Sequence, residues 1–162
     1  MPNVNVLTFN SRGLRHASKR RALFRHFHHY YPTHIVVLQE THSAPRDVAY
    51  WQAEWGAPVM FSHGPSTSEC GVAVLLPRSL LGICNVVVKH SDDAGRLLNV
   101  DFSFEQLTVL ICAVYAPTQG HMQQQLVLFN TMKAKLNTFT ANDDAYLIVC
   151  GDFNLHLSKL DT

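Results

Sequence analysis

Short apolar runs rich in strand-forming residues recur along this chain, and the order in which they alternate with helical segments constrains its fold. Residues 4–9 and 35–38 are strand-like, and a helical pattern over residues 18–30 separates them. Residues 107–115 and 146–150 are again strand-like, with an amphipathic segment between them. Helices that alternate with buried strands at both ends, with hairpins between, indicate a mixed α/β domain.

The central part of the chain favours β-structure. Further strands are predicted at residues 59–62, 71–76, 83–89 and 97–102, and residues 103–106 are short enough to join the last of these to the next strand as a hairpin. A weaker helix is predicted over residues 47–55. No repeat or linker interrupts residues 1–162, so we expect a single domain.

Apolar side chains at helical spacing indicate how the helices should pack. In the first helix we predict Ser18 as the N-cap. The stripe facing the core is predicted to contain Leu23, Phe27 and Tyr30, with Phe24 and Tyr31 alongside. The last helix carries an apolar face made of Met122, Leu126, Phe129 and Leu136. In the shorter helix between them we expect core packing from Trp51 and Trp55.

Composition excludes several classes of protein. A hydrophobic fraction of 47% and a charged fraction of 15% argue against disorder. No apolar run approaches the roughly 20 residues needed to span a bilayer, and no signal-peptide pattern is present, so we expect an intracellular protein without a membrane partner. The cysteines lack a CxxC pair and are expected to be buried reduced thiols: Cys70, Cys84, Cys112 and Cys150.

Four of the predicted strands end on a polar or anionic side chain. These side chains are Asn10, Glu40, Tyr115 and Asp152, with Asn154 close behind the last. If the strands lie together, the five groups meet at one rim of the sheet. Each residue alone has an ordinary reading as a turn, strand-end or half-buried residue, and the joint pattern is what favours a functional site.

The oxygen-rich character of this group suits a hard divalent cation. Glu40 and Asp152 supply carboxylates, Asn10 and Asn154 supply carboxamides, and no cysteine or histidine stands at a strand end. Mg²⁺ prefers oxygen ligands and typically uses one or two carboxylates together with substrate phosphate oxygens. Such an ion can polarise a phosphoryl oxygen, and a second carboxylate can orient or deprotonate the attacking water.

Five stretches in order resemble the exonuclease–endonuclease–phosphatase superfamily, which contains the apurinic endonucleases and deoxyribonuclease I. They are LTFNSRGL at 7–14, LQETH at 38–42, GVAVL at 71–75, VYAP at 114–117 and GDFN at 151–154. One such stretch is a weak match, whereas five in order are highly specific. Within the superfamily the chain is most similar to the endonuclease domain of LINE-type, non-LTR retrotransposons.

The resemblance implies a four-layered α/β sandwich of two packed mixed β-sheets flanked by helices, which cleaves DNA phosphodiesters with Mg²⁺ or Mn²⁺. It implies that Glu40 binds the metal with Asn10 beside it, and that Tyr115 contacts the phosphate. Asp152 would orient or activate the water, with Asn154 as its supporting carboxamide. It further implies a nuclear protein that nicks double-stranded DNA, possessing a reverse transcriptase domain in the same full-length polypeptide.

One element of the family pattern is absent. The family ends with a Ser-Asp-His stretch after two further strands, and no Ser-Asp-His occurs in this sequence. We therefore expect residues 1–162 to be the N-terminal two-thirds of the domain, to lack its last strands, and to have little or no activity alone. Two alternatives stay open: a phosphoesterase of the same fold acting on inositol phosphates or sphingomyelin, and a non-catalytic remnant that only binds.

A basic cluster directly follows the first strand. Because the formal net charge is only +1, any affinity for nucleic acid must come from a local patch of this kind. The candidates for DNA-phosphate contacts are Arg12, Arg15, Lys19 and Arg20, with Arg21 and Arg25 nearby. The alternative is a solvated helix face. The three histidines on the same helix are expected on the solvated surface: His26, His28 and His29.

Overall fold

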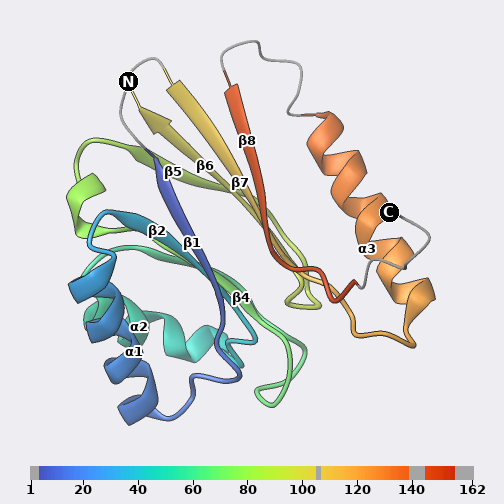
Figure 1. Cartoon of the computed structure of the whole chain (residues 1–162), viewed down its shortest axis with the longest axis horizontal. Coiled ribbons are helices and arrows are strands. Elements are labelled where there is room, and N and C mark those ends of the chain that lie inside the picture. The colour runs from blue at the N-terminus through green and yellow to red at the C-terminus, as the bar shows by residue number, and fades with distance from the viewer. Residues whose placement is uncertain (1–3, 105–106, 139–144, 156–162) are drawn as a thin grey trace.

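Two four-stranded sheets lie face to face in the computed structural model, which describes residues 4–104, 107–138 and 145–155 (Figure 1). The first sheet has the order β1 (Asn5–Asn10), β2 (His34–Gln39), β4 (Val72–Leu75), β3 (Val59–Ser62). The second has the order β5 (Asn85–Ser91), β6 (Leu97–Phe104), β7 (Leu107–Tyr115), β8 (Ala145–Asp152). The β1–β2 and β7–β8 pairs are parallel and the others antiparallel, so both sheets are mixed.

Helices cover the outer face of each sheet. Two of them, α1 (Ala17–Tyr30) and α2 (Val48–Trp55), pack on the first sheet, and α3 (Met122–Asn137) packs on the second (Figure 1). Two short 3₁₀ turns are η1 (Pro45–Asp47) and η2 (Arg78–Leu80). This arrangement is the predicted four-layered α/β sandwich. Within the described ranges no helix is long and apolar enough to cross a membrane.

The alternation of side chains along β2 explains how one strand serves two cores. Ile35 and Val37 point into the cluster between the sheets, where they meet Val100 and Ile111 of the second sheet. The alternate residues of β2, such as Leu38, point to the other face of the sheet, into the cluster beneath α1 and α2. A strand buried on both faces reads as a continuous apolar run, which is why this strand was predictable from sequence.

The first helix packs through most of the predicted stripe, because Phe24 and Phe27 are buried and Leu23 and Tyr31 pack against the same core. It begins at Ala17, so Ser18 is not its N-cap, and the predicted core residue Tyr30 is 63% exposed. The buried residues of α1 are Arg20, Phe24 and Phe27. An arginine occupies the inward position of the first turns because it has a carboxylate partner on α2, and sequence periodicity does not count a charged residue as core.

In the last helix the predicted apolar face is confirmed at Phe129 and Leu136 and wrong in the first turns. Met122 is 80% exposed and Leu126 is 53% exposed. The side chains that pack on the second sheet are Leu128, Phe129, Met132 and Leu136. Gln125 takes the inward place on the first turns and donates a hydrogen bond to the Pro117 carbonyl at 2.7 Å. A polar anchor therefore replaces the apolar contact expected there.

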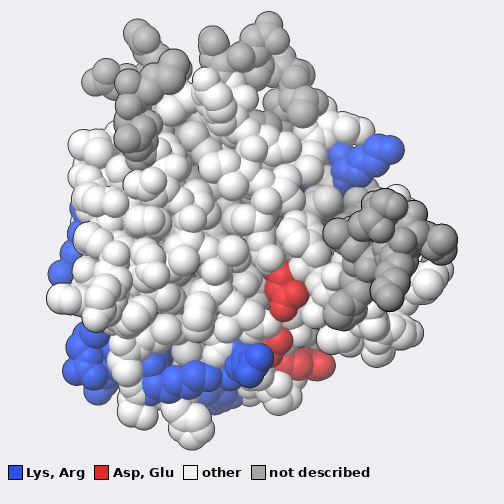
Figure 2. Space-filling view, in the orientation of Figure 1, with Lys and Arg blue, Asp and Glu red and all other residues white. Residues whose placement is uncertain are grey.

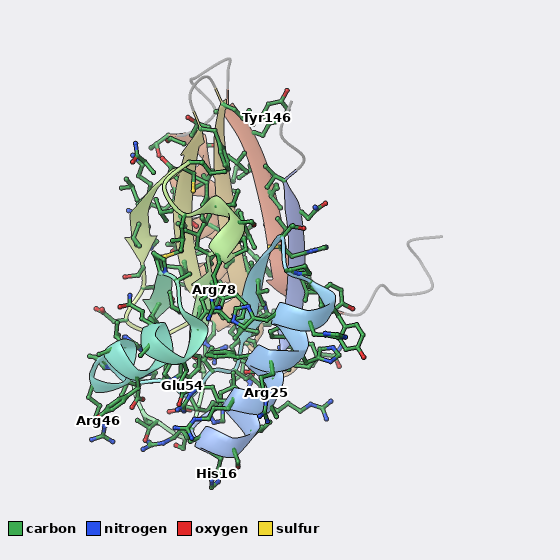
Figure 3. All side chains as sticks on the ribbon, turned by 90° about the vertical axis from the view of Figure 1, so that its left-hand side faces the viewer. His16, Arg25, Arg46, Glu54, Arg78 and Tyr146 are labelled. Atoms are coloured by element: carbon green, nitrogen blue, oxygen red, sulfur yellow. The ribbon has the colours of Figure 1, made fainter. Side chains whose placement is uncertain are left out.

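The strands β1 and β8, which carry the beginning of the first and last of the five family-like stretches, lie at the edges of their sheets. Both β1 and β8 were predicted as core strands, yet Phe9 is 43% exposed and Tyr146 is 55% exposed. Figure 3 shows Tyr146, which lies near the N-terminal end of β8, far from His16, the residue that precedes α1. Apolar composition predicts a strand correctly here, but it does not tell how many neighbours the strand has.

The remaining predictions about elements differ only in detail. The hairpin between β6 and β7 is confirmed by pairing of Phe104 with Leu107, and residues 105–106 of its connection lie outside the described residues. Trp51 and Trp55 are each 1% exposed, as expected of core residues. His28 is not a solvated residue, because its ring stacks on Trp55 at 4.1 Å and its Nε2 lies 3.0 Å from the Trp55 carbonyl oxygen.

Candidate active site at the rim between the sheets

The two parallel strand pairs bring the predicted site residues to one end of the sandwich. Asn10 ends β1 and pairs with Gln39, the last residue of β2, so Glu40 follows directly beside it. On the second sheet, Tyr115 ends β7 and pairs with Asp152, which ends β8. Parallel neighbours end at the same edge, and this edge is where α/β proteins commonly place ligands.

Hydrogen bonds join these residues across the gap between the sheets. The Asn10 amide Nδ2 lies 2.8 Å from Oε1 of Glu40 and 2.9 Å from Oδ2 of Asp152, and it donates to both. The Tyr115 hydroxyl donates to Oε1 of Glu40 at 3.0 Å. Two carboxylates from different sheets therefore share one donor, and a tyrosine of the second sheet contacts a glutamate of the first.

The orientation of the Asn10 carboxamide is chemically determined. Its Oδ1 accepts a hydrogen bond from the backbone N–H of Arg12 at 3.1 Å, and its two N–H groups serve the two carboxylates. A flipped amide would place its oxygen against both carboxylates and its N–H groups against another donor. In this arrangement Asn10 holds Glu40 and Asp152 together, and its predicted role beside the metal stays a prediction.

Glu40 is suited to hold a cation through its second carboxylate oxygen. Oε1 already accepts from Asn10 and Tyr115, whereas no group in the described ranges donates to Oε2. The residue also has a left-handed backbone, with φ of 51°. A non-glycine residue in that conformation is strained and persists where its surroundings hold it, which is common at functional sites.

The donor set fits an oxygen-preferring ion and not a zinc-type cluster. In the part of the chain that the structure describes, no group of three or more His, Cys, Asp or Glu side chains is placed to hold a metal. One or two carboxylates supplemented by water and substrate oxygens are the way in which Mg²⁺ is usually held. Glu40, with Asp152 beside it, matches that pattern.

The cysteines do not contribute to this site. All four are free, with Cys70 and Cys112 buried and Cys84 and Cys150 partly buried. Burial raises the pKa of Cys112 to about 12 and that of Cys150 to about 11. The thiolate is the form that binds metals or attacks substrates, so these thiols are inert at neutral pH. The prediction of buried free thiols is confirmed for Cys70 and Cys112, whereas Cys84 and Cys150 are free but only partly buried.

Tyr115 is held as a neutral hydrogen-bond donor. Burial, followed by the charge of Glu40 and the hydrogen bond to it, raises the pKa of Tyr115 to about 12. The hydroxyl therefore keeps its proton at any pH at which the protein would work. The guanidinium of Arg96 lies 5.2 Å from the ring centroid and also donates to the Tyr115 carbonyl oxygen at 3.3 Å.

Asn154 supports Asp152 through its backbone. The Asn154 N–H donates to Oδ1 of Asp152 at 3.1 Å, whereas its side-chain Nδ2 donates to the Ala116 carbonyl at 2.7 Å. With φ of 47°, Asn154 is a second left-handed residue at the rim. The carboxamide thus ties the GDFN turn to the segment after β7, and its predicted contact with Asp152 is made by the main chain instead.

Sequence reasoning missed Arg96 and Gln39. Arg96 could have been found from the register of the β6–β7 hairpin. Leu97 pairs with Val114, which places Arg96 opposite Tyr115. Gln39 is only 1% exposed, and its Nε2 donates to Oγ1 of Thr8 at 3.0 Å. A glutamine that ends an apolar strand could have been recognised as a buried polar group that needs a partner.

An open hollow of about 440 Å³ lies beside the four linked residues. It is lined by Thr8, Asn10, Gln39, Asp152 and Asn154, among others. Hydroxyl, carboxamide and carboxylate groups line it together with the apolar side chains of Phe153 and Leu155. The hollow therefore offers polar partners next to Asp152 and apolar surface beside them.

The basic cluster separates into structural and solvent-facing members. Arg20 is 7% exposed and forms a two-point ion pair with Glu54, so it is unavailable to DNA and its prediction as a phosphate contact is wrong. Arg21 contacts the same carboxylate at 2.9 Å. Figure 3 shows Arg25 and Glu54 on the helical layer. Lys19 contacts backbone carbonyls, and this leaves Arg12 and Arg15 as exposed candidates near the rim.

Positive charge is nevertheless concentrated beside the site. Figure 2 shows Lys and Arg side chains in a band along the lower margin of the molecule, over the α1 end of the first sheet. The acidic side chains visible on this face lie directly next to that band. Asp152 also lines one hollow together with Arg12 and Lys19, so a carboxylate of the site lies near cationic side chains.

Comparison with known proteins agrees with this geometry. The chain is 35% identical over 127 residues to an uncharacterized 149 kDa protein of transposon TX1 from Xenopus laevis, a match that covers 78% of this chain and 9% of that protein. Among solved structures, it is similar to D. rerio TDP2 complexed with single strand DNA product, with a TM-score of 0.66 and 21% identity over 94% of this chain and 61% of that one.

A further similar structure comes from a mobile element. The endonuclease domain of TRAS1, a telomere-specific non-LTR retrotransposon, has a TM-score of 0.63 and 15% identity, covering 96% of this chain and 62% of that one. The chain thus spans less than two-thirds of either structure. At these identities the likeness establishes the fold. The family model for the Endonuclease/Exonuclease/phosphatase family matches residues 4–162, and the chain belongs to that family.

Proposed function

We propose that the rim binds Mg²⁺ or Mn²⁺ and hydrolyses phosphodiester bonds in DNA, as an endonuclease of a LINE-type element. The observation that carries this proposal is the linkage of Glu40 and Asp152 through Asn10, with Tyr115 donating to Glu40. Carboxylates repel one another, so a pair held close by a shared neutral donor is well placed to share a cation with a substrate phosphate.

Each residue has a distinct task in the proposed reaction. Glu40 would hold the ion through Oε2, and the ion would supply charge that polarises the phosphoryl group. Asp152, fixed by Asn10 and by the Asn154 N–H, would orient the attacking water and accept its proton. Tyr115, which keeps its proton, would turn its one O–H from Glu40 to a phosphate oxygen when the substrate binds.

DNA is favoured over a small phosphoester by the surroundings of the site. The basic band borders the rim, and two of the similar structures are the endonuclease domain of a retrotransposon and a complex with a single strand DNA product. We further propose that the chain acts in the nucleus, in one polypeptide with a reverse transcriptase. Inositol phosphates and sphingomyelin remain the alternative substrates for the same residues.

The test compares metal binding with turnover. Mn²⁺ binding by residues 1–162 is measured by electron paramagnetic resonance, and nicking of supercoiled plasmid is measured in the gene product that carries this chain. We expect saturable Mn²⁺ binding and Mg²⁺-dependent nicking, with little turnover by residues 1–162 alone. Hydrolysis of inositol phosphates without nicking would favour the alternative substrate, and absence of both metal binding and nicking would favour a non-catalytic remnant.

A first prediction concerns the basic band. Changing both Arg12 and Arg15 to Gln should lower the slope of log Kd against log salt by about 2, because each arginine that neutralises a phosphate of duplex DNA contributes roughly 0.9. Both side chains are exposed, and the hydrogen bonds of these residues use their backbones. Fluorescence anisotropy with a labelled duplex, in a series of KCl concentrations, measures the slope.

The matched control removes two charges elsewhere. Lys133 and Lys135 are exposed on the second half of α3, which runs away from the rim (Figure 1). Their joint change to Gln should leave the slope unaltered. If the control pair and the rim pair lowered the slope equally, the band would contribute only net charge and not a path for the DNA backbone.

A further inference from the structure

Lys19 holds the loop that follows β1. Its ammonium nitrogen Nζ lies 2.8 Å from the Ser11 carbonyl oxygen, 2.9 Å from that of Arg12 and 2.9 Å from that of Gly13. An ammonium group has three N–H donors, so these three consecutive carbonyls use all of them. Lys19 is exposed, but all three of its donors point at the protein's own backbone.

The opposite side of the same loop is bonded to the segment that carries Glu40. The N–H groups of Ser11 and Gly13 donate to the carbonyls of Gln39 and Glu40 at 2.8 and 2.7 Å. The Ser11 hydroxyl also donates to both of these carbonyls, at 2.8 and 3.0 Å. The loop therefore lies between Lys19 on one side and the end of β2 on the other.

The backbone in this region needs such a constraint. Arg12 has φ of 50° and Glu40 has φ of 51°, and neither is a glycine. Residues in this conformation are strained and persist only where several contacts hold them. The Arg12 N–H is also the group that orients the Asn10 carboxamide. A shift of the loop would thus disturb the donor that links both carboxylates.

We propose that Lys19 is a positioning residue for the active site, which fixes the 11–13 loop and through it Asn10 and Glu40. This proposal rests on the proposed function of the rim. It assigns to Lys19 no contact with DNA, with a cation or with the reacting atoms. Its role depends on three donors converging from one nitrogen, and not on positive charge alone.

That distinction makes Lys19→Arg the informative variant. Arginine keeps the charge, but its donors lie in a planar fork that cannot point at three consecutive carbonyls as one ammonium does. If Lys19 contacted DNA, Lys19→Arg would preserve the function. Because we assign it to the loop, both Lys19→Arg and Lys19→Met should reduce kcat for nicking by about 10- to 100-fold with little change in KM.

A structural readout is independent of turnover. Amide hydrogen exchange, followed by NMR in residues 1–162, measures the exchange rates of the Gly13 and Leu14 N–H groups. These two groups donate to the carbonyl oxygens of Glu40 and Thr41. We expect these two amides to exchange at least about tenfold faster in both Lys19 variants, since a loop released on one side opens more often. Amides within β6 serve as the reference for global stability.

The outcomes separate this proposal from the proposed function. If the wild-type protein neither binds Mn²⁺ nor nicks DNA, the function fails, and the exchange rates still decide the role of Lys19. If the wild type is active and Lys19→Arg matches it in kcat and in exchange at Gly13, the positioning role is overturned. If faster exchange in the variants extends equally to β6, Lys19 stabilises the whole fold, and the local role is again overturned.

Discussion

Glu40→Gln should abolish Mn²⁺ binding at the rim and lower the rate of DNA nicking by about 1,000-fold or more, as expected when a metal that supplies several kcal/mol of stabilisation is lost. The variant is close to isosteric. Asn10 and Tyr115 both donate to Oε1, and a glutamine oxygen can accept both hydrogen bonds. Its amide nitrogen would replace Oε2, and a nitrogen that carries two protons cannot bind a cation.

The control for this variant is Glu69→Gln. Glu69 is exposed, and its side chain contacts only a nearby serine among the described residues, so the same chemical change there should alter neither metal binding nor nicking. Urea unfolding should give similar free energies of unfolding for Glu40→Gln and the wild type. Retention of Mn²⁺ affinity and nicking in folded Glu40→Gln would remove Glu40 as the metal-binding residue.

The grouping of the site residues within each sheet was predictable because topology fixes it. Parallel pairing follows from helices that connect neighbouring strands, and the ends of parallel strands meet at one edge. Asn10 beside Glu40, and Tyr115 beside Asp152, could therefore be expected from their positions at the ends of parallel strands. The meeting of these two pairs depends on how the two sheets pack, which strand ends alone do not determine.

The contacts inside the group were less predictable. A carboxamide can donate or accept, and only its neighbours decide that Asn10 donates to two carboxylates. The role of Asn154 depends on which of its polar groups faces Asp152, and it is the backbone N–H. These contacts depend on where each polar group lies in three dimensions, which the spacing of residues in the sequence does not encode.

Charged residues were the other source of error. Six basic residues lie between positions 12 and 25, and sequence alone does not separate those that face solvent from those that are enclosed. Arg20 is buried because Glu54 on α2 lies opposite it, 34 positions away in sequence. A long-range ion pair has no local signature, so Arg20 could not be distinguished from Arg15 before the structure.

The second large effect is expected at the glycine before Asp152. Gly151 has φ of 143°, and a Cβ added there would lie 1.9 Å from the Val114 carbonyl oxygen of β7. The obstacle is backbone, which cannot rotate aside as a flexible side chain can. Gly151→Ala should therefore lower the free energy of unfolding by about 3 kcal/mol, the upper range for forced overpacking.

The same substitution should also displace the site. Gly151 pairs with Val114, and the next pair along the two strands is Asp152 with Tyr115. If β8 moves away from β7 at this point, Asp152 loses its alignment with Tyr115 and its 2.9 Å contact with Asn10. Mn²⁺ affinity should then fall even at temperatures at which the variant is fully folded, which calorimetry and paramagnetic resonance can measure together.

Gly82→Ala separates steric conflict from backbone conformation. Gly82 also has a positive φ, 76°, but nothing lies within 4 Å of an added Cβ. The conformational cost there is about 1 kcal/mol, and Mn²⁺ binding should not change. If Gly151→Ala cost no more than Gly82→Ala in urea unfolding, the contact with Val114 would be easily relieved. The close approach of β8 to β7 would then not be what positions Asp152.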